Sequence, residues 1–98
     1  MVLARVVGTV VSSHKSQKIE GIKFLLLDKI DPVSMKGKGD FVVSMDSVGA
    51  GPGDIVFYVS GSSARNTDVT EEKPSDSAVI AIVDHIEKDG AFTYQKNR

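Results

Sequence analysis

The feature that most constrains the fold of this chain is a series of short apolar runs, separated by segments rich in glycine or polar residues. Valine, isoleucine and threonine are frequent in these runs, and such β-branched side chains pack well on a pleated sheet. No long amphipathic helical pattern lies between the runs. The pattern predicts an all-β fold, either an antiparallel barrel or a sandwich, with strands near residues 2–12, 22–28, 41–45 and 54–60.

Two interruptions of the apolar pattern refine this prediction. An isolated glycine within the first run, Gly8, predicts a bulge or a tight bend of the kind found in curled sheets. The segment of residues 29–40 combines a proline, two glycines and several charges, and therefore predicts an exposed connection or hairpin tip.

The segment of residues 74–90 is consistent with two interpretations. A helix could begin at Ser75, which suits an N-cap, and end at Gly90. Against a helix, β-branched side chains crowd residues 79–83, which favours a buried strand. The predicted elements are a short helical turn at 75–78, a strand at 79–86, a hairpin turn at 89–90 and a strand at 92–95.

These elements fit a small five-stranded barrel of the oligonucleotide-binding type with one short helical turn, and a sandwich is the main alternative. The 98 residues suffice for one modest hydrophobic core, so a single domain spanning residues 1–98 is predicted. A chain this short buries only about 60–65% of the surface that its unfolded form exposes. Burial of a further face against a partner copy would therefore stabilise it.

The composition limits the cellular environments and the classes of binding partner that are expected for this chain. The 12 basic and 13 acidic residues give a net charge of −1, which provides no electrostatic footprint for nucleic acid. The absence of cysteine excludes disulfides and fits a cytoplasmic location. The N-terminal run contains Arg5 and no small-residue cleavage signal, and no run approaches about 18 apolar residues, so neither a signal peptide nor a membrane span is predicted.

The glycines of the VGAGPGD segment, at positions 49, 51 and 53, look like a phosphate cradle but fail the tests for one. A dinucleotide fingerprint would need a glycine at the position of Asp54, and no Gly-Lys-Ser/Thr closes the segment as in a P-loop. A tight glycine turn that leads into a strand is the simpler interpretation.

No catalytic or metal-binding constellation is found in the sequence. His14 and His85 lie far apart and lack partners at metal-ligand spacing. Ser62 and Ser63 have no GxSxG elbow around them and no assignable histidine and acid. The prediction is that the protein is not an enzyme and binds no cofactor and no metal.

A module that binds single-stranded nucleic acid is the alternative function, because barrels of this type often carry stacking aromatics on one face. The chain has four phenylalanines and two tyrosines, most of them inside apolar strands. Core packing explains them without a ligand, and the chain is not basic.

Four strings in their order along the chain resemble a known family: VVGTVVSSHK, GIKFLLLD, DSVGAGPGDIVFYVSGSSAR and PSDSAVIAIVD. They are similar to the pentameric vertex proteins of bacterial microcompartment shells, the EutN/CcmL family. The resemblance covers nearly the whole chain. It implies a small β-barrel that assembles as a cyclic homopentamer and caps the vertices of a polyhedral shell enclosing metabolic enzymes.

The resemblance also implies roles for three groups of residues. The family's GSSAR loop, expected near the five-fold axis, corresponds to Gly61, Ser62, Ser63, Ala64 and Arg65. The turn expected to shape the subunit contact corresponds to Asp46, Val48, Gly49, Ala50, Gly51, Gly53 and Asp54. The short helical turn and the strand after it correspond to Pro74, Asp76, Ala78, Ile82, Val83 and Asp84.

The partners implied by the resemblance are other copies of this chain and the hexameric tiles of a microcompartment shell, with no nucleic acid and no membrane. A flat layer of six-fold tiles cannot close, and five-fold units at the corners supply the curvature. If the GSSAR loop surrounds the axis, five copies of Ser62 and Ser63 would form a narrow polar ring able to hold a small anion or water.

Overall fold

The computed structural model describes residues 1–11, 21–61 and 77–96. All regular elements in these ranges are strands, which confirms the predicted all-β class. They are β1 (Val2–Val10), β2 (Phe24–Ile30), β3 (Gly37–Asp46), β4 (Ile55–Ser60), β5 (Ser77–Ile82), β6 (His85–Lys88) and β7 (Ala91–Gln95).

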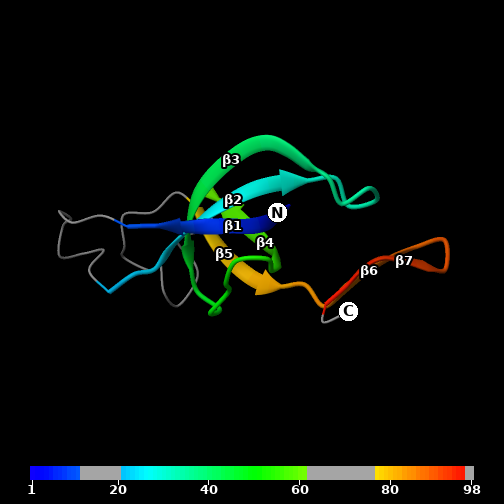
Figure 1. Cartoon of the computed structure of the whole chain (residues 1–98). Helices are drawn as coiled ribbons and strands as arrows, with labels where there is room; N and C mark the ends of the chain where they lie inside the picture. Colours follow the sequence, from blue (N-terminus) through cyan, green and yellow to red (C-terminus); the bar gives the residue numbers. More distant parts are fainter. Residues whose placement is uncertain (12–20, 62–76, 97–98) are drawn as a thin grey trace.

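The first five strands form a closed barrel, which confirms the predicted five-stranded barrel, and their order around it is β1-β2-β3-β5-β4 (Figure 1). All neighbouring pairs in the barrel are antiparallel except β3 and β5, which run parallel. This parallel contact is short and joins Met45 to Ala78 and Asp46 to Val79. The prediction of a wholly antiparallel barrel is therefore wrong at this one joint. β5 closes the barrel by lying between β4, to which it is antiparallel, and β3, to which it is parallel.

The interior of the barrel is filled by residues that alternate along the strands. Ala4 and Val6 of β1 and Leu25 and Leu27 of β2 are at most 1% exposed and belong to the main core cluster. Side chains of successive strand residues point to opposite faces, so this spacing of two directs them all inward. The register of β1 against β2 shifts between Val6 and Gly8, which confirms the predicted irregularity at Gly8.

Strand β4 is apolar on both faces because it contributes to two cores. Val56 and Tyr58 lie in the main cluster, whereas Ile55 belongs to a second cluster with Ile30 and Val83. Partly buried hydrophobic residues pack against this second cluster from β1, β4, the β2–β3 connection, β6 and β7: Leu3, Phe57, Met35, Ile86 and Tyr94. The continuous apolar run of β4 thus reflects burial against the barrel interior on one side and this outer cluster on the other.

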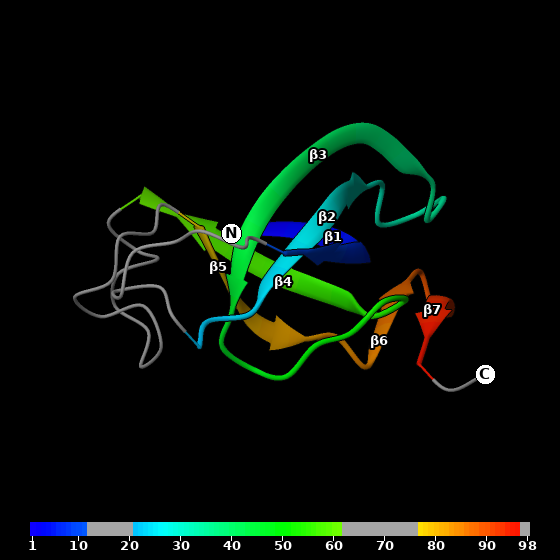
Figure 2. The ribbon, with the colours of Figure 1, turned by 60° about the vertical axis from the view of Figure 1, so that its left-hand side comes forward.

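The C-terminal strands β6 and β7 form a separate two-stranded sheet that projects from the barrel (Figures 1 and 2). Asp89 and Gly90 connect them with φ of 54° and 81°, which confirms the predicted hairpin turn. The hairpin is fastened to the barrel by Thr93, whose Oγ1 donates to the carbonyl oxygen of Pro32 at 2.8 Å.

Two predictions for residues 75–86 are wrong. Ser77 and Ala78, expected in a helical turn, begin β5, because they pair with Ser60 and Val59 of β4. The single strand expected over 79–86 is interrupted after Ile82. There the backbone N–H of Val83 donates to the carbonyl oxygen of Ile55 at 2.8 Å, and the chain then leaves the barrel to start the hairpin.

The segment of residues 29–40 is a hairpin connection whose flanks extend the strands further than predicted. β2 continues to Ile30 and β3 already starts at Gly37. Asp31 organises the turn: its Oδ1 accepts hydrogen bonds from the backbone N–H groups of Val33 at 2.8 Å and Ser34 at 3.0 Å. These bonds, first that of Ser34 and then that of Val33, lower the pKa of Asp31.

Candidate functional site

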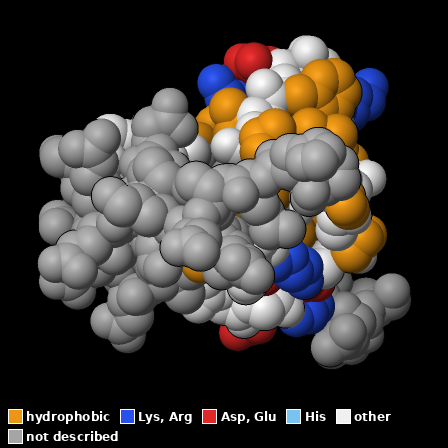
Figure 3. Space-filling model, turned by 90° about the vertical axis from the view of Figure 1, so that its left-hand side faces the viewer, with side chains coloured by type: hydrophobic (Ala, Val, Ile, Leu, Met, Phe, Trp, Pro, Cys, Tyr) orange, Lys and Arg blue, Asp and Glu red, His pale blue; other side chains and the backbone are white. Residues whose placement is uncertain are grey.

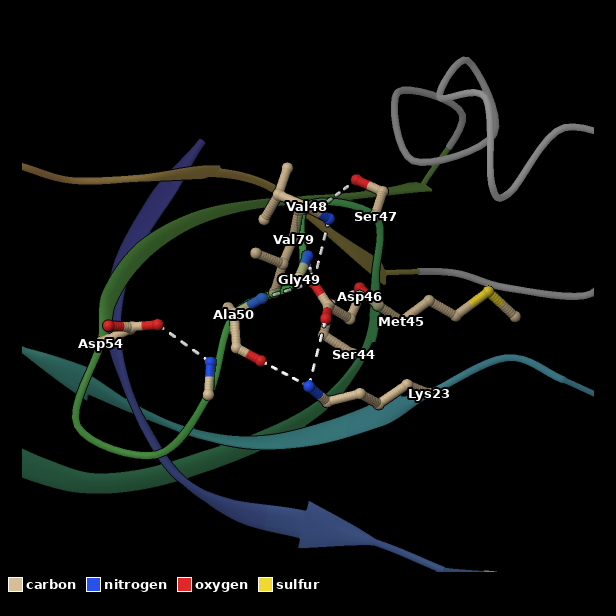
Figure 4. Close-up of polar contacts among 11 residues, drawn as sticks. Lys23, Ser44, Met45, Asp46, Ser47, Val48, Gly49, Ala50, Asp54 and Val79 are labelled. Carbon is tan, nitrogen blue, oxygen red and sulfur yellow. Dashed lines mark hydrogen bonds and ion pairs between the residues drawn. The ribbon is translucent and has the colours of Figure 1, made fainter.

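The turn of residues 46–54, which joins β3 to β4, is organised by one carboxylate (Figure 4). Oδ1 of Asp46 accepts hydrogen bonds from the backbone N–H groups of Val48, Gly49 and Ala50, at 3.0, 3.1 and 3.3 Å. Aspartate favours this local geometry because its short side chain reaches the backbone two to four residues ahead. The first half of the turn is therefore held by a single side chain.

The charge of Asp46 is compensated by Lys23, which precedes β2. The Asp46 side chain is only 3% exposed, and its Oδ2 lies 3.6 Å from Nζ of Lys23, a side chain that is 49% exposed. The same Nζ donates to the carbonyl oxygen of Ala50 at 2.6 Å. Lys23 thus links the beginning and the middle of the turn, and the buried carboxylate is both paired and hydrogen-bonded.

The second half of the turn is held by Asp54 and by β1. Oδ2 of Asp54 accepts a hydrogen bond from the N–H of Gly51 at 2.9 Å. The N–H of Gly53 donates to the carbonyl oxygen of Val6 at 2.8 Å, and the N–H of Val6 donates to the carbonyl oxygen of Asp54 at 2.9 Å. Lys96, near the C-terminus, lies 3.8 Å from Asp54.

The glycines of the turn have different conformational requirements. Gly49 and Gly53 have φ of 79° and 93°, in the left-handed region that other residues rarely adopt. Gly51 has no such φ, and a Cβ added to it would meet nothing within 4 Å. Ala50 is fully buried in the main core, while Val48 is 38% exposed. The turn therefore presents one side to the core and the other to solvent.

The structure brings the predicted turn beside the strand that was predicted to follow the helical turn. Asp46 pairs with Val79 across the β3–β5 joint, and the backbone N–H of Ser47 lies 3.3 Å from the carbonyl oxygen of Val79. The hydroxyl of Ser47 donates to the same oxygen. These contacts join the two segments that carry the predicted turn residues and the predicted strand residues, although Ser47 and Val79 themselves are not among the predicted site residues.

The remaining predicted residues lie in several places. Ala78 is buried in β5, Ile82 ends that strand, and Val83 belongs to the second core cluster. Asp84 follows β5, and its carbonyl oxygen accepts a hydrogen bond from the N–H of Lys96. Gly61 directly follows β4 with φ of 67°. Outside the described residues lie Ser62, Ser63, Ala64, Arg65, Pro74 and Asp76.

Sequence reasoning missed Lys23 and the serine pair that supports the β3–β5 joint. Oγ of Ser77 donates to Oγ of Ser44 at 2.9 Å, and both serines are buried. Each of these residues finds its partner at long range, so no short-range pattern could have identified them. Buried polar groups with satisfied partners specify one arrangement of the strands that carry them.

The polar groups of the described site are engaged within the turn itself. In the described ranges, no buried side-chain nitrogen or oxygen lacks a hydrogen-bond partner. The same ranges contain no group of three or more potential metal ligands. No helix of the described part is long and apolar enough to cross a membrane. The carboxylates of Asp46 and Asp54 are engaged by backbone N–H groups and lysines, so the arrangement can position a loop.

Comparison with known proteins identifies relatives over almost the whole chain. The family model described as "Ethanolamine utilisation protein EutN/carboxysome" matches residues 1–84. The chain is 41% identical over 96 residues to the carboxysome shell vertex protein CcmL of Gloeobacter violaceus, which covers 98% of this chain and 95% of that protein. A solved structure of Gloeobacter violaceus CcmL matches with a TM-score of 0.91 and 40% identity, over 100% of both chains.

Two further relatives come from other microcompartments. The bacterial microcompartment shell vertex protein EutN of Escherichia coli strain K12 is 38% identical over 96 residues, which are 98% of this chain and 100% of EutN. The solved GrpN pentameric microcompartment shell protein from Rhodospirillum rubrum matches with a TM-score of 0.78 and 39% identity, over 90% of this chain and 98% of GrpN. These relatives are shell proteins and not enzymes, which confirms the predicted structural role. The chain belongs to the EutN/CcmL family of microcompartment shell vertex proteins.

Proposed function

We propose that this protein closes into a ring of five copies that caps the vertices of a polyhedral bacterial microcompartment. The observation that carries the proposal is the match over nearly the full length to shell vertex proteins, together with the structural match to a GrpN protein described as pentameric. Residues 1–98 would act as one domain in this ring.

The surface of the barrel supports assembly. Two large apolar side chains on β3 are about half exposed: Phe41 at 55% and Val43 at 48%. Figure 3 shows hydrophobic side chains gathered on one face, flanked by lysine or arginine and by acidic residues. A chain of this size has a small core, and burying such a face against identical neighbours in a closed ring would stabilise it.

The proposed role of the ring is geometric. Five-fold units introduce curvature into a layer of six-fold tiles, so the ring would present the same edge five times to hexameric shell proteins. The rigid turn of residues 46–54 would shape the contact with the neighbouring subunit. The loop of residues 61–65 would lie near the five-fold axis, where Ser62 and Ser63 would form a polar ring.

The mass of the purified protein in solution tests the proposal directly. Five chains of 10.5 kDa give about 53 kDa by native mass spectrometry or light scattering, with no open-ended series of larger species. A monomer or dimer across the accessible concentration range would refute the ring.

A nucleic-acid titration tests the alternative function. Because the net charge is −1, fluorescence anisotropy of a labelled single-stranded oligonucleotide at low salt should show no saturable binding. Tight binding that weakens steeply with salt would replace the shell proposal by a nucleic-acid-binding one.

A further inference from the structure

Strand β3 has one edge that the described part of the barrel leaves mostly unpaired. On one side, β3 pairs with β2 from Gly37 to Met45. On the other side, its only strand partner among the described residues is β5, through Met45 and Asp46. The backbone N–H and C=O groups of residues 37–44 on that side are therefore available to a further strand.

The same stretch of β3 exposes large apolar side chains. Phe41 is 55% exposed and Val43 is 48% exposed. Beside them, a hollow separates β3 from the ends of β4 and β5, and its lining includes Tyr58 and Ser60. In Figure 2, β3 stays beside β2 and arches away from β4 and β5 over this region. An unpaired edge with exposed apolar side chains is a typical site of strand addition.

The β6–β7 hairpin is a second element whose strand edges lack partners in the described structure. It forms a sheet of only two strands, and within the described ranges neither strand pairs with a third. Phe92 is 51% exposed, and its ring contact in the described structure is a T-shaped one with His85, at 5.1 Å between centroids. Two-stranded sheets are marginally stable in water, so addition to a larger sheet would stabilise this one.

Charges at the two elements are complementary. At the hairpin tip, Lys88 is paired with Asp89 at 2.7 Å, which leaves the negative charge of Glu87 without an ion pair in the described structure. Next to the free edge, neither Lys36 nor Lys38 forms an ion pair with a described residue, although the charge of Lys38 is a minor cause of the lowered pKa of Asp31. Opposite charges on two separate patches favour the association of one patch with the other rather than with itself.

We propose that the β6–β7 hairpin of one copy of this chain docks along the free edge of β3 in the next copy and places Phe92 against Phe41 and Val43. The contact joins two different patches, so it is head-to-tail, the type of interface that generates a ring when the rotation closes. This inference rests on the proposed pentamer and names the surfaces that build it.

Cysteine crosslinking tests the contact without background because the chain contains no cysteine. A double variant, Val43→Cys with Phe92→Cys, is treated with a short bismaleimide and run on a denaturing gel. Head-to-tail docking predicts a ladder of covalent species up to five chains. Each single variant, treated identically, should remain monomeric on the gel. In the proposed contact, position 43 meets position 92 of the neighbour, and copies of one position come together only near the five-fold axis.

The outcomes separate this inference from the proposed function. A native mass of five chains without a ladder, or a ladder with either single variant, would overturn the docking of the hairpin on β3 and leave the ring intact. A native mass of the unaltered protein below five chains would overturn both the docking and the proposed ring.

A charge substitution gives an independent test with a matched control. Val43→Glu should abolish the pentamer at a concentration where the parent protein is fully assembled. Val7→Glu should keep it, since Val7 is similarly exposed at 43% but lies on β1, which β2 separates from β3. Circular dichroism confirms that both variants are folded. Retention of the pentamer by the Val43 variant would contradict the proposal.

Discussion

The two ends of β3 differ in how far contacts within the single chain bury them and pair their polar groups. At its C-terminal end, Asp46 is 3% exposed and is bonded to three backbone N–H groups and to Lys23. At its N-terminal end, residues 37–41 are all exposed, and the edge away from β2 has no partner in the described structure. One end of β3 is thus complete within the single chain, whereas the other end carries the edge that we propose pairs with a neighbouring copy.

The largest effect should follow from removing the carboxylate that completes the C-terminal end. Asp46→Ala deletes the acceptor of three backbone N–H groups and the partner of Lys23, and should lower the free energy of unfolding by about 3 kcal/mol. Urea denaturation measures the change. Asp46→Asn retains an acceptor oxygen and is the control, with a smaller loss. A loss below about 1 kcal/mol for the alanine variant would show that the turn does not depend on this side chain.

A smaller effect should come from the glycines of the same turn, which form a matched pair. Gly53→Ala places a Cβ at φ of 93° and should cost about 1–2 kcal/mol. Gly51→Ala meets open space without a positive φ, and should be neutral or stabilise by up to about 1 kcal/mol through the unfolded state. Thermal unfolding of both variants checks the difference, and equal losses would contradict the conformational argument.

The smallest effect should appear at the N-terminal end of β3, where Asp31 holds the exposed connection. Its pKa is lowered from the ordinary value of 3.8 because the N–H groups of Ser34 and Val33 bond its charged form. A lowered pKa contributes stability that is present above pH 3.8 and is lost as the pH falls through the folded-state value.

Denaturation midpoints measured from neutral to acidic pH test this contribution. The parent protein should lose more stability below about pH 4 than Asp31→Asn, which keeps an acceptor oxygen but does not titrate. Equal losses of stability at acidic pH for the two proteins would show that the hydrogen bonds to Asp31 do not favour its charged form over its neutral form.

Most strands could be predicted because their signals are local. The alternation that buries Leu25 and Leu27 follows from the two-residue period of a strand. The turn at Asp89 and Gly90 could be predicted because both residues tolerate positive φ. The apolar run of β4 indicated a strand but did not reveal that its outer face would be covered by a C-terminal hairpin.

The predicted site could be recognised only in part. The turn of residues 46–54 was identified through its string of glycines and acids, whereas Lys23, which neutralises Asp46, carried no signal because nothing in its own surroundings points to that carboxylate. The helical turn was assigned to residues that include Ser77 and Ala78, because Ser75 resembles an N-cap. Pairing of Ser77 and Ala78 with β4 prevailed over that local preference.

The sequence by itself determined the all-β class, the positions of most strands, the irregularity at Gly8 and the family to which the chain belongs. These properties depend on residues that are neighbours in the chain or on strings that relatives share. Only the tertiary structure decided the parallel β3–β5 joint, the break after Ile82 and the unpaired edge of β3. The physical reason is that barrel closure depends on contacts between residues far apart in the sequence, and no local pattern contains them.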